Sequence, residues 1–233
     1  MMTWKNLTDN AYTPYSATPK ACVVKGSGGT LFAGVRIESI SFPTTIPALQ
    51  AACCICLSEG EQPVEVYAPD SDLEHLDFWL KEFDLILNQQ DTPPEGTYFN
   101  PFRADESNPE RLALLLDKAV TPHSDFQVSC ILTTKSGTVE GVNIEVSAWT
   151  MGLCAERVAI AKAISAGERE FIKMSVHTRT GSFSSPCGAC RQVITEHMPL
   201  HSIELFHPNE TESVHLSADL LPFSFTSKAL KKQ

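Results

Sequence analysis

The chain contains the same sequence pattern twice, once in each half. Tyr12-Thr13-Pro14-Tyr15-Ser16 matches Val120-Thr121-Pro122-His123-Ser124. Further along, Gly34-Val35-Arg36-Ile37-Glu38 matches Gly141-Val142-Asn143-Ile144-Glu145 in the same order. Two ordered matches predict that the halves fold into two copies of one architecture, so a fold proposed for one half must also suit the other.

Strand and helix patterns alternate in both halves, which is typical of the α/β class. Turn signals and alternating apolar residues predict strands over 20–26, 30–38, 64–68, 126–134, 138–145, 172–178 and 202–206. Helical spacing predicts helices over 47–58, 73–87, 110–120 and 154–166, one that starts at 187, and a short one over 217–221. The segment 88–108 is rich in Pro, Asp and Glu and is expected to be a linker between domains 1–87 and 109–233.

Two cysteine motifs lie at the starts of neighbouring helices in the second half. One is Cys154-Ala155-Glu156-Arg157, and the other is Pro186-Cys187-Gly188-Ala189-Cys190. A catalytic zinc takes three protein ligands and leaves its fourth position to water. We therefore expect Cys154, Cys187 and Cys190 to bind one Zn²⁺ per chain, in the pattern of a zinc deaminase.

Glu156 follows the first cysteine by two residues and is expected to be the catalytic acid/base. On the same helical turn it lies near the metal without ligating it, so it can take a proton from water and deliver one to departing ammonia. Three thiolates and a hydroxide on one Zn²⁺ leave a negative site. Arg157 is expected to offset that charge, together with the helix N-termini. Arg191 either adds to this effect or is a surface charge.

A closed structural zinc site or a redox dithiol is the alternative for these cysteines. A structural site normally has four protein ligands, and no fourth Cys or His with suitable spacing lies nearby. A redox Cys-x-x-Cys motif explains neither Cys154 nor Glu156. The catalytic interpretation accounts for all four residues.

From about Ala119 to Leu230 the chain resembles a cytidine deaminase of the small three-cysteine type. Five motifs carry the resemblance, in family order: Thr121–Val128, Gly141–Glu145, Cys154–Arg157, Ser185–Ile194 and Leu220–Phe225. The resemblance implies two tandem α/β/α layered domains, each with a mixed sheet. It also implies hydrolytic deamination of a cytosine nucleoside.

The resemblance implies nucleoside contacts at four side chains. Asn143 and Glu145 would hydrogen-bond the ribose 3′-hydroxyl, and their spacing on a strand turns them to the same side. Phe126 and Phe225 would pack on the nucleoside. Without the motifs, the two phenylalanines would be interpreted as core aromatics.

Two backbone groups would hold the base. The resemblance implies that the N–H of Ala155 binds the pyrimidine O2 and that the carbonyl of Ser185 faces the amino group. The sequence departs from the family pattern at His123, Ser129 and Trp149, where Tyr, Gly and Tyr are usual. These departures affect the expected pyrimidine preference and leave the ligands and the acid/base intact.

The first half lacks this chemistry. In the register of the repeat, Pro47 stands opposite Cys154 and Leu49 stands opposite Glu156. The first copy is therefore expected to be a degenerate, non-catalytic domain.

Three further cysteines, Cys53, Cys54 and Cys56, lie close together in the first half. In the register of the repeat they fall on an ordinary helix. We expect them to be small buried hydrophobic residues rather than a second metal site.

Composition narrows the classes of partner. The formal net charge is −10, and the only basic pair is Lys231-Lys232. Nucleic-acid affinity comes mainly from Lys and Arg contacts to phosphate, so no nucleic-acid partner is expected. No apolar run is long enough to span a membrane, and the start of the chain lacks a signal-peptide core. Eight cysteines suit a reducing compartment, and the expected location is the cytoplasm.

The expected function is zinc-dependent hydrolysis of cytidine and deoxycytidine to uridine and deoxyuridine in pyrimidine salvage. Small family members form tetramers, so a fused two-copy chain is expected to build the same arrangement as a homodimer. In the better-known fused members the working copy comes first, whereas here it comes second. The alternatives are deamination of another cytosine-containing small molecule, and a non-catalytic nucleoside- or zinc-binding module.

Overall fold

The computed structural model describes residues 2–105 and 107–225. The first half forms one four-stranded sheet with the order β2-β1-β3-β4. Its strands are β1 (Ala21–Gly26), β2 (Leu31–Val35), β3 (Pro63–Ala68) and β4 (Ile86–Gln89). Its helices are α1 (Trp4–Thr8), the 3₁₀ turn η1 (Phe42–Thr44), α2 (Ala48–Ser58) and α3 (Leu76–Phe83).

The second half forms a six-stranded sheet with the order β10-β9-β8-β6-β7-β5. Its strands are β5 (Phe102–Arg103), β6 (Val128–Thr134), β7 (Gly137–Val142), β8 (Phe171–Thr178), β9 (Ser202–Phe206) and β10 (Glu212–Leu216). Its helices are α4 (Pro109–Leu115), η2 (Leu116–Lys118), η3 (Trp149–Met151), α5 (Ala155–Ser165), α6 (Gly188–His197) and η4 (Ser217–Leu220).

The two sheets share one topology. In the first, β1 pairs antiparallel with β2 and β3, and β3 pairs parallel with β4. In the second, β6 pairs antiparallel with β7 and β8, and β8 pairs parallel with β9. The predicted α/β fold with two mixed sheets is therefore confirmed. The second copy adds β5 at one edge and β10 at the other.

Helices cover both faces of the second sheet. Neighbouring residues of a strand point to opposite faces, and on β6 the Ser129 hydroxyl donates to Leu112 O of α4 over 2.8 Å. The next residue, Cys130, faces α5 on the other side of the sheet. The charges of Glu156 and Lys162 of α5 both influence the pKa of its thiol. The sheet therefore lies between α4 and α5, as expected for an α/β/α layer.

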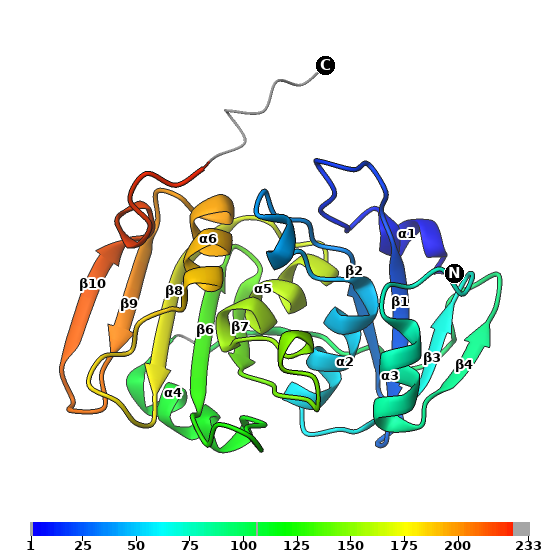
Figure 1. Cartoon of the computed structure of the whole chain (residues 1–233), viewed down its shortest axis with the longest axis horizontal. Coiled ribbons are helices and arrows are strands. Elements are labelled where there is room, and N and C mark those ends of the chain that lie inside the picture. Colours follow the sequence, from blue (N-terminus) through cyan, green and yellow to red (C-terminus); the bar gives the residue numbers. More distant parts are fainter. Residues whose placement is uncertain (1, 106, 226–233) are drawn as a thin grey trace.

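The two copies pack against each other through α2 and α5, which lie between the two sheets (Figure 1). Every residue of both helices is buried. A helix that is buried on all sides needs apolar or small residues around its whole circumference, and the Ala, Ile and Cys residues of α2 and α5 meet that need. One continuous hydrophobic core joins the copies.

The segment expected to be a linker makes strand contacts with both sheets. Phe99 N donates to Leu31 O at the edge of β2, and β5 pairs with β7 at the edge of the second sheet. The helix expected over 73–87 ends at Phe83, because Asp84 adopts a left-handed conformation with φ 53°. β4 follows, so the domain boundary expected at residue 87 falls within a strand.

The long central helices were predicted well, and several short elements were missed. The helices expected over 47–58 and 154–166 agree with α2 and α5 within a residue or two. The short elements α1, β4, β5 and β10 were not predicted.

No helix in the described ranges is long and apolar enough to cross a membrane.

Candidate active site and metal centre

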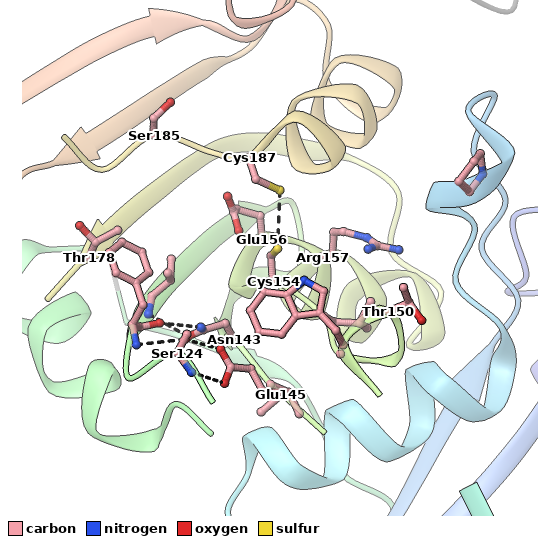
Figure 2. Close-up of a pocket in the computed structure, with 17 residues that line it drawn as sticks. Ser124, Asn143, Glu145, Thr150, Cys154, Glu156, Arg157, Thr178, Ser185 and Cys187 are labelled. Carbon is pink, nitrogen blue, oxygen red and sulfur yellow. Dashed lines mark hydrogen bonds between the residues drawn. The ribbon is translucent and has the colours of Figure 1, made fainter. Parts of the chain in front are cut away.

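The three predicted ligands come together at the N-termini of two helices, and Figure 2 shows two of them, Cys154 and Cys187. Cys154 is the N-cap of α5, and Cys187 is the N-cap of α6, which also carries Cys190 in its first turn. Their sulfur atoms all lie within 4.8 Å of one another. Within the described part of the chain, no other group of three His, Cys, Asp or Glu side chains gathers in this way.

The spacing of the sulfur atoms fits a tetrahedral metal. Cys154 Sγ and Cys187 Sγ are 3.7 Å apart, whereas a disulfide bond is about 2.0 Å long. Two thiolates bound to one zinc at about 2.3 Å in tetrahedral geometry would lie about 3.8 Å apart. The geometry therefore fits zinc and excludes a disulfide between these two residues.

The electrostatics of the three thiols also call for a cation. Hydrogen bonds from Cys154 and Cys190, joined by the backbone N–H groups of Cys190 and Ala189, lower the pKa of the Cys187 thiol. The hydrogen bonds with Cys154 and Cys187 raise the pKa of the Cys190 thiol. The hydrogen bond with Cys187 raises the pKa of the Cys154 thiol. One thiolate therefore suppresses the others, and all three ionise together only when a metal ion balances their charge.

Glu156 lies beside the sulfur atoms in the first turn of α5 (Figure 2). Its side chain lines the cavity described below, although the residue is only 3% exposed. Burial raises the pKa of this carboxyl to about 7. A carboxyl group with a pKa near neutrality can both accept and release a proton at physiological pH.

The side chain of Arg157 is held by a hydrogen bond to the first copy. Its Nη2 donates to Thr44 O of η1 over 2.9 Å, and its Nε is buried with no hydrogen-bond partner among the described residues. A buried N–H without an acceptor is costly. Since Arg157 follows the ligand Cys154 by three residues and lines the same cavity, this free donor is consistent with a negative metal centre nearby.

Arg191 stabilises the loop that leads to Cys187. Its Nε donates to Pro186 O over 2.8 Å, and its Nη1 donates to Leu220 O over 3.3 Å. Its Nη2 reaches the Ser185 hydroxyl. Arg191 is therefore not a free surface charge, because its side chain ties the loop before Cys187 to η4. Its contribution to the charge balance of the thiolates stays a prediction.

A cavity of about 570 Å³ opens onto Cys154, Cys187 and Glu156. Five other predicted residues line it: Phe126, Asn143, Glu145, Arg157 and Ser185. Ala155 is fully buried at the start of α5 and is not among the lining residues. Phe225 is 55% exposed and does not line this cavity either.

Asn143 and Glu145 organise the wall of the cavity. Asn143 accepts from Val128 N and donates to Phe126 O, both over 2.8 Å, so it sets the backbone that carries Phe126. Glu145 accepts from the Ser124 hydroxyl and from the backbone N–H groups of His123 and Ser124. Burial opposes ionisation of Glu145, but these hydrogen bonds lower its pKa below the ordinary value.

The first copy keeps the same carboxylate arrangement. Glu38 accepts from the Ser16 hydroxyl and from the backbone N–H groups of Tyr15 and Ser16. The arrangement therefore has a structural role that does not require a ligand. In the first copy Arg36, the equivalent of Asn143, forms ion pairs with Glu38 and Glu74.

The contact between a strand glycine and a helix within each copy confirms the register of the repeat. A Cβ atom on Gly34 would lie 2.3 Å from Ala48 O and 2.4 Å from Ala52 N. A Cβ atom on Gly141 would lie 2.2 Å from Ala155 O and 2.7 Å from Ala159 N. The first turns of α2 and α5 are thus equivalent, so Pro47 and Leu49 occupy the places of Cys154 and Glu156.

The cysteines of α2 are buried, as predicted. Cys53, Cys54 and Cys56 are each 0% exposed, and burial raises the pKa of all three thiols. They therefore remain protonated and contribute to the core as small apolar side chains.

Sequence reasoning missed several residues of the cavity. Ser124, Trp149, Thr150 and Thr178 line it, and Ser124 and Trp149 could have been suspected from the motifs around them. Pro43 also lines it and comes from η1 of the first copy. No local pattern could have identified Pro43, because its position depends on how the two copies pack.

Comparisons with known proteins agree with this geometry. Residues 103–201 match one family profile described as the cytidine and deoxycytidylate deaminase zinc-binding region, and residues 5–68 match a second profile with the same description.

Individual relatives match about half of the chain. The cytidine deaminase of Sporosarcina psychrophila is 42% identical over 119 residues, which cover 49% of this chain and 85% of that one. The cytidine deaminase of Halalkalibacterium halodurans is 38% identical over 114 residues, covering 47% and 85%. The crystal structure of cytidine deaminase from Burkholderia pseudomallei matches 50% of this chain and 94% of that chain, with 36% identity and a TM-score of 0.48.

Proposed function

The chain belongs to the cytidine and deoxycytidylate deaminase family, and we propose that it hydrolyses cytidine and deoxycytidine to uridine and deoxyuridine with release of ammonia. The observation that carries this proposal is the meeting of three cysteine sulfurs with a buried glutamic acid at the wall of one cavity. We assign the catalysis to the second copy, 109–233, and a non-catalytic role to 1–87.

Cys154, Cys187 and Cys190 would hold a zinc ion, which when bound supplies a Lewis acid that makes water nucleophilic at neutral pH. Glu156 transfers the protons of the reaction. Its carboxylate accepts one from the attacking water, passes it to N3 of the pyrimidine, and carries the next to the amino nitrogen that leaves as ammonia. Arg157 places a positive charge beside the thiolates.

The cavity wall would position the nucleoside. Glu145 is ionised and has acceptor capacity beyond its present hydrogen bonds, so it suits a ribose hydroxyl donor. Asn143 lies two residues away and would join it. The exposed ring of Phe126 offers an apolar face for the nucleoside, the Ala155 N–H would bind O2, and the Ser185 carbonyl would accept from the amino group.

The charge of the cavity favours a nucleoside over a nucleotide. Among the described residues that line it, Arg157 is the single Lys or Arg. Its Nη2 is engaged by Thr44 O, and we assign its remaining donor, Nε, to the thiolates. A phosphate would need free cationic donors, whereas Glu145 places a negative charge in the cavity. A polynucleotide is disfavoured for the same reason, and the formal net charge of −10 adds to it.

We also propose that the protein is a homodimer in the cytoplasm and acts in pyrimidine salvage. Phe42 and Trp149 support the dimer: they are equivalent residues of η1 and η3, and they are 84% and 70% exposed. Aromatic residues such as Trp and Phe are enriched at protein–protein interfaces relative to the rest of the surface. The exposed Phe225 would then be free to reach a cavity of the partner. Light scattering of the purified protein tests the dimer.

The test of the function is the loss of cytidine absorbance on adding zinc-loaded protein, with Glu156→Gln as the matched variant. We expect turnover that falls about 10²- to 10⁴-fold in the variant, while both proteins bind one zinc per chain. Deoxycytidine should react and deoxycytidylate should not.

Two results would contradict the proposal. No turnover of either nucleoside at one zinc per chain would favour another cytosine-containing substrate or a non-catalytic binding module. Faster turnover of deoxycytidylate than of deoxycytidine would refute the preference for an uncharged substrate.

A further inference from the structure

A side chain of the non-catalytic copy contacts the turn that leads to the metal centre. Gln50, in the first turn of α2, is 4% exposed. Its Nε2 donates to Met151 O over 2.9 Å and lies 3.4 Å from Gly152 O. Cys54, one helical turn further along α2, directs its sulfur to Met151 O at 4.0 Å.

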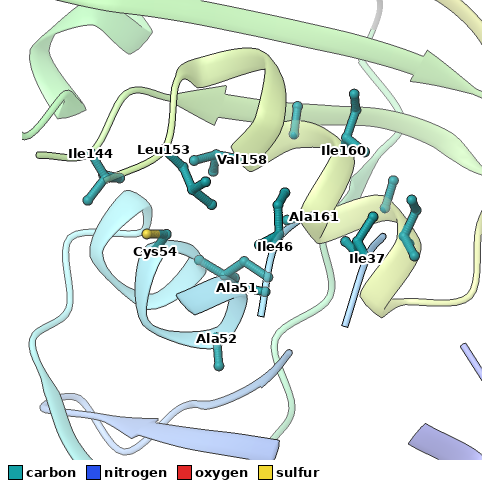
Figure 3. Close-up of a cluster of buried hydrophobic side chains, with 14 of the residues drawn as sticks. Ile37, Ile46, Ala51, Ala52, Cys54, Ile144, Leu153, Val158, Ile160 and Ala161 are labelled. Carbon is teal, nitrogen blue, oxygen red and sulfur yellow. The ribbon is translucent and has the colours of Figure 1, made fainter. Parts of the chain in front are cut away.

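The opposite side of this turn is fixed by the second copy itself. Leu153 and Ile144 exchange two backbone hydrogen bonds of 2.9 and 2.8 Å. Gly152 is so close to this bridge that a Cβ atom would lie 2.4 Å from Ile144 O. Figure 3 shows Cys54 of α2 next to Leu153 and Ile144 at this junction. The turn is therefore held by Gln50 from the first copy and by Ile144 from the second.

The turn forms part of the cavity wall and leads directly into a predicted metal ligand. Trp149 and Thr150 line the cavity, and Cys154 follows Leu153 as the N-cap of α5. Cys154 follows the two acceptors of Gln50 closely, since it lies two positions after Gly152 and three after Met151. A shift of the turn would therefore displace both a metal ligand and the cavity wall.

The contact is one half of a reciprocal pair. In the register of the repeat, Gln50 is equivalent to Arg157, and Met151 is equivalent to Thr44. Arg157 donates to Thr44 O over 2.9 Å, and Gln50 donates to Met151 O over the same distance. The first copy lost the ligand and the acid/base at positions 47 and 49 but kept a hydrogen-bond donor at position 50.

We propose that Gln50 is a positioning residue for the metal centre of the second copy, fixing through Met151 O and Gly152 O the turn that presents Cys154. The role assigned to the metal rests on the proposed function, but the positioning itself does not. Groups that orient metal ligands from outside typically change metal affinity or activity about 10- to 100-fold when they are removed. The non-catalytic copy is thereby part of the catalytic apparatus.

The test replaces Gln50 with Met, which keeps the length and packing of the side chain and removes both donors. Gln50→Leu is a second variant in case the first folds poorly. Ser58→Ala is the matched control, because Ser58 is buried in the same helix and donates only to Ile55 O of that helix, over 2.7 Å. It should cost stability without touching the turn.

Zinc affinity is measured by competition with a chromophoric chelator, and the ligand geometry by the thiolate-to-metal absorption bands of the Co²⁺-substituted protein. We expect Gln50→Met and Gln50→Leu to weaken zinc binding about 10-fold or more and to shift the Co²⁺ bands. Cytidine turnover should fall with kcat affected more than KM. Ser58→Ala should match the wild type in all three measurements.

Unchanged zinc affinity and unchanged Co²⁺ bands in a folded Gln50 variant would overturn the proposal and leave Gln50 a packing residue. Equal losses in Ser58→Ala would overturn it too. If the wild type does not deaminate cytidine, the proposed function fails, while the Co²⁺ bands and the zinc affinity still decide the role of Gln50.

Discussion

Gly34 and Gly141 hold equivalent places in the two copies, each pressed against the first turn of the helix that crosses its strand. Space for a Cβ atom is absent at both, since backbone atoms of Ala48 and Ala155 lie 2.3 and 2.2 Å from the respective Cβ positions. Only α5 carries the proposed catalytic groups. The pair therefore compares a helix that carries the proposed catalytic groups with one that reaches the site only through Gln50.

Gly34→Ala and Gly141→Ala should both lower the free energy of unfolding by about 1–3 kcal/mol, because each forces a helix away from its sheet. Gly141→Ala should also reduce cytidine turnover, since the displaced turn contains Ala155 and Glu156. Gly34→Ala should lower kcat less, since the first turn of α2 that it displaces reaches the site only indirectly, through Gln50. Urea unfolding and steady-state kinetics measure the two effects, and an equal loss of kcat in both variants would contradict the interpretation.

Glu145 and Glu38 form a second matched pair, because both accept hydrogen bonds from a serine hydroxyl and two backbone N–H groups. Replacing either with Gln should cost stability. Glu145→Gln should in addition lower kcat/KM for cytidine about 10-fold or more, since a charge-assisted hydrogen bond to the ribose contributes about 1.5–3 kcal/mol. If Glu38→Gln lowered kcat/KM equally, Glu145 would be a structural residue only.

Arg157→Gln places at position 157 the side chain that the first copy has at the equivalent position, Gln50. We expect zinc affinity and kcat to fall, because the positive charge beside three thiolates is lost. Arg157→Lys should give intermediate values, since it keeps the charge but not the planar guanidinium. Zinc competition and kinetics measure both variants, and wild-type zinc affinity in Arg157→Gln would refute the charge-compensation role.

Metal removal should abolish turnover and expose the ligand thiols. Of the eight cysteines, Cys22, Cys53, Cys54, Cys56 and Cys130 are fully buried, and burial raises the pKa of each thiol. Zinc-loaded protein should therefore react slowly with a thiol reagent, whereas chelated protein should gain reactivity at Cys154 and Cys187 first. Added Zn²⁺ should restore turnover and protection. Full turnover without metal would exclude the mechanism.

His197, the last residue of α6, should make stability depend on pH. Its ring lies 4.7 Å from that of Tyr12, its Nε2 is buried without a hydrogen-bond partner among the described residues, and burial lowers its pKa from 6.5 to about 4. The unfolded chain therefore binds a proton at His197 more tightly than the folded protein does. The free energy of unfolding should therefore fall as the pH drops from 6.5 to 4, by up to about 3 kcal/mol.

The measurement is urea unfolding of the wild type and His197→Phe at pH 7 and pH 4.5. Metal loss at low pH affects both proteins, so the difference between them isolates His197. A wild type that loses no more stability than His197→Phe between the two pH values would contradict the prediction.

The sequence by itself determined the chemistry and the repeated architecture. Cys154, Glu156, Cys187 and Cys190 could be identified because spacing along two helix starts fixes which side chains meet a metal. The register of Gly34 with Gly141 showed which copy had lost its ligands. Short elements such as β4 and β10 escaped prediction, because edge strands of four or five residues depend on pairing partners more than on their own pattern.

Only the tertiary structure decided how the copies cooperate. Arg157 reaches Thr44 O, Gln50 reaches Met151 O, and Pro43 enters the cavity, so all three contacts cross from one copy to the other. These contacts join residues about a hundred positions apart, and periodicity describes only which face of a helix is apolar. Because α2 and α5 are buried on every face, their sequences could not show which residues meet; the packing of one copy on the other did.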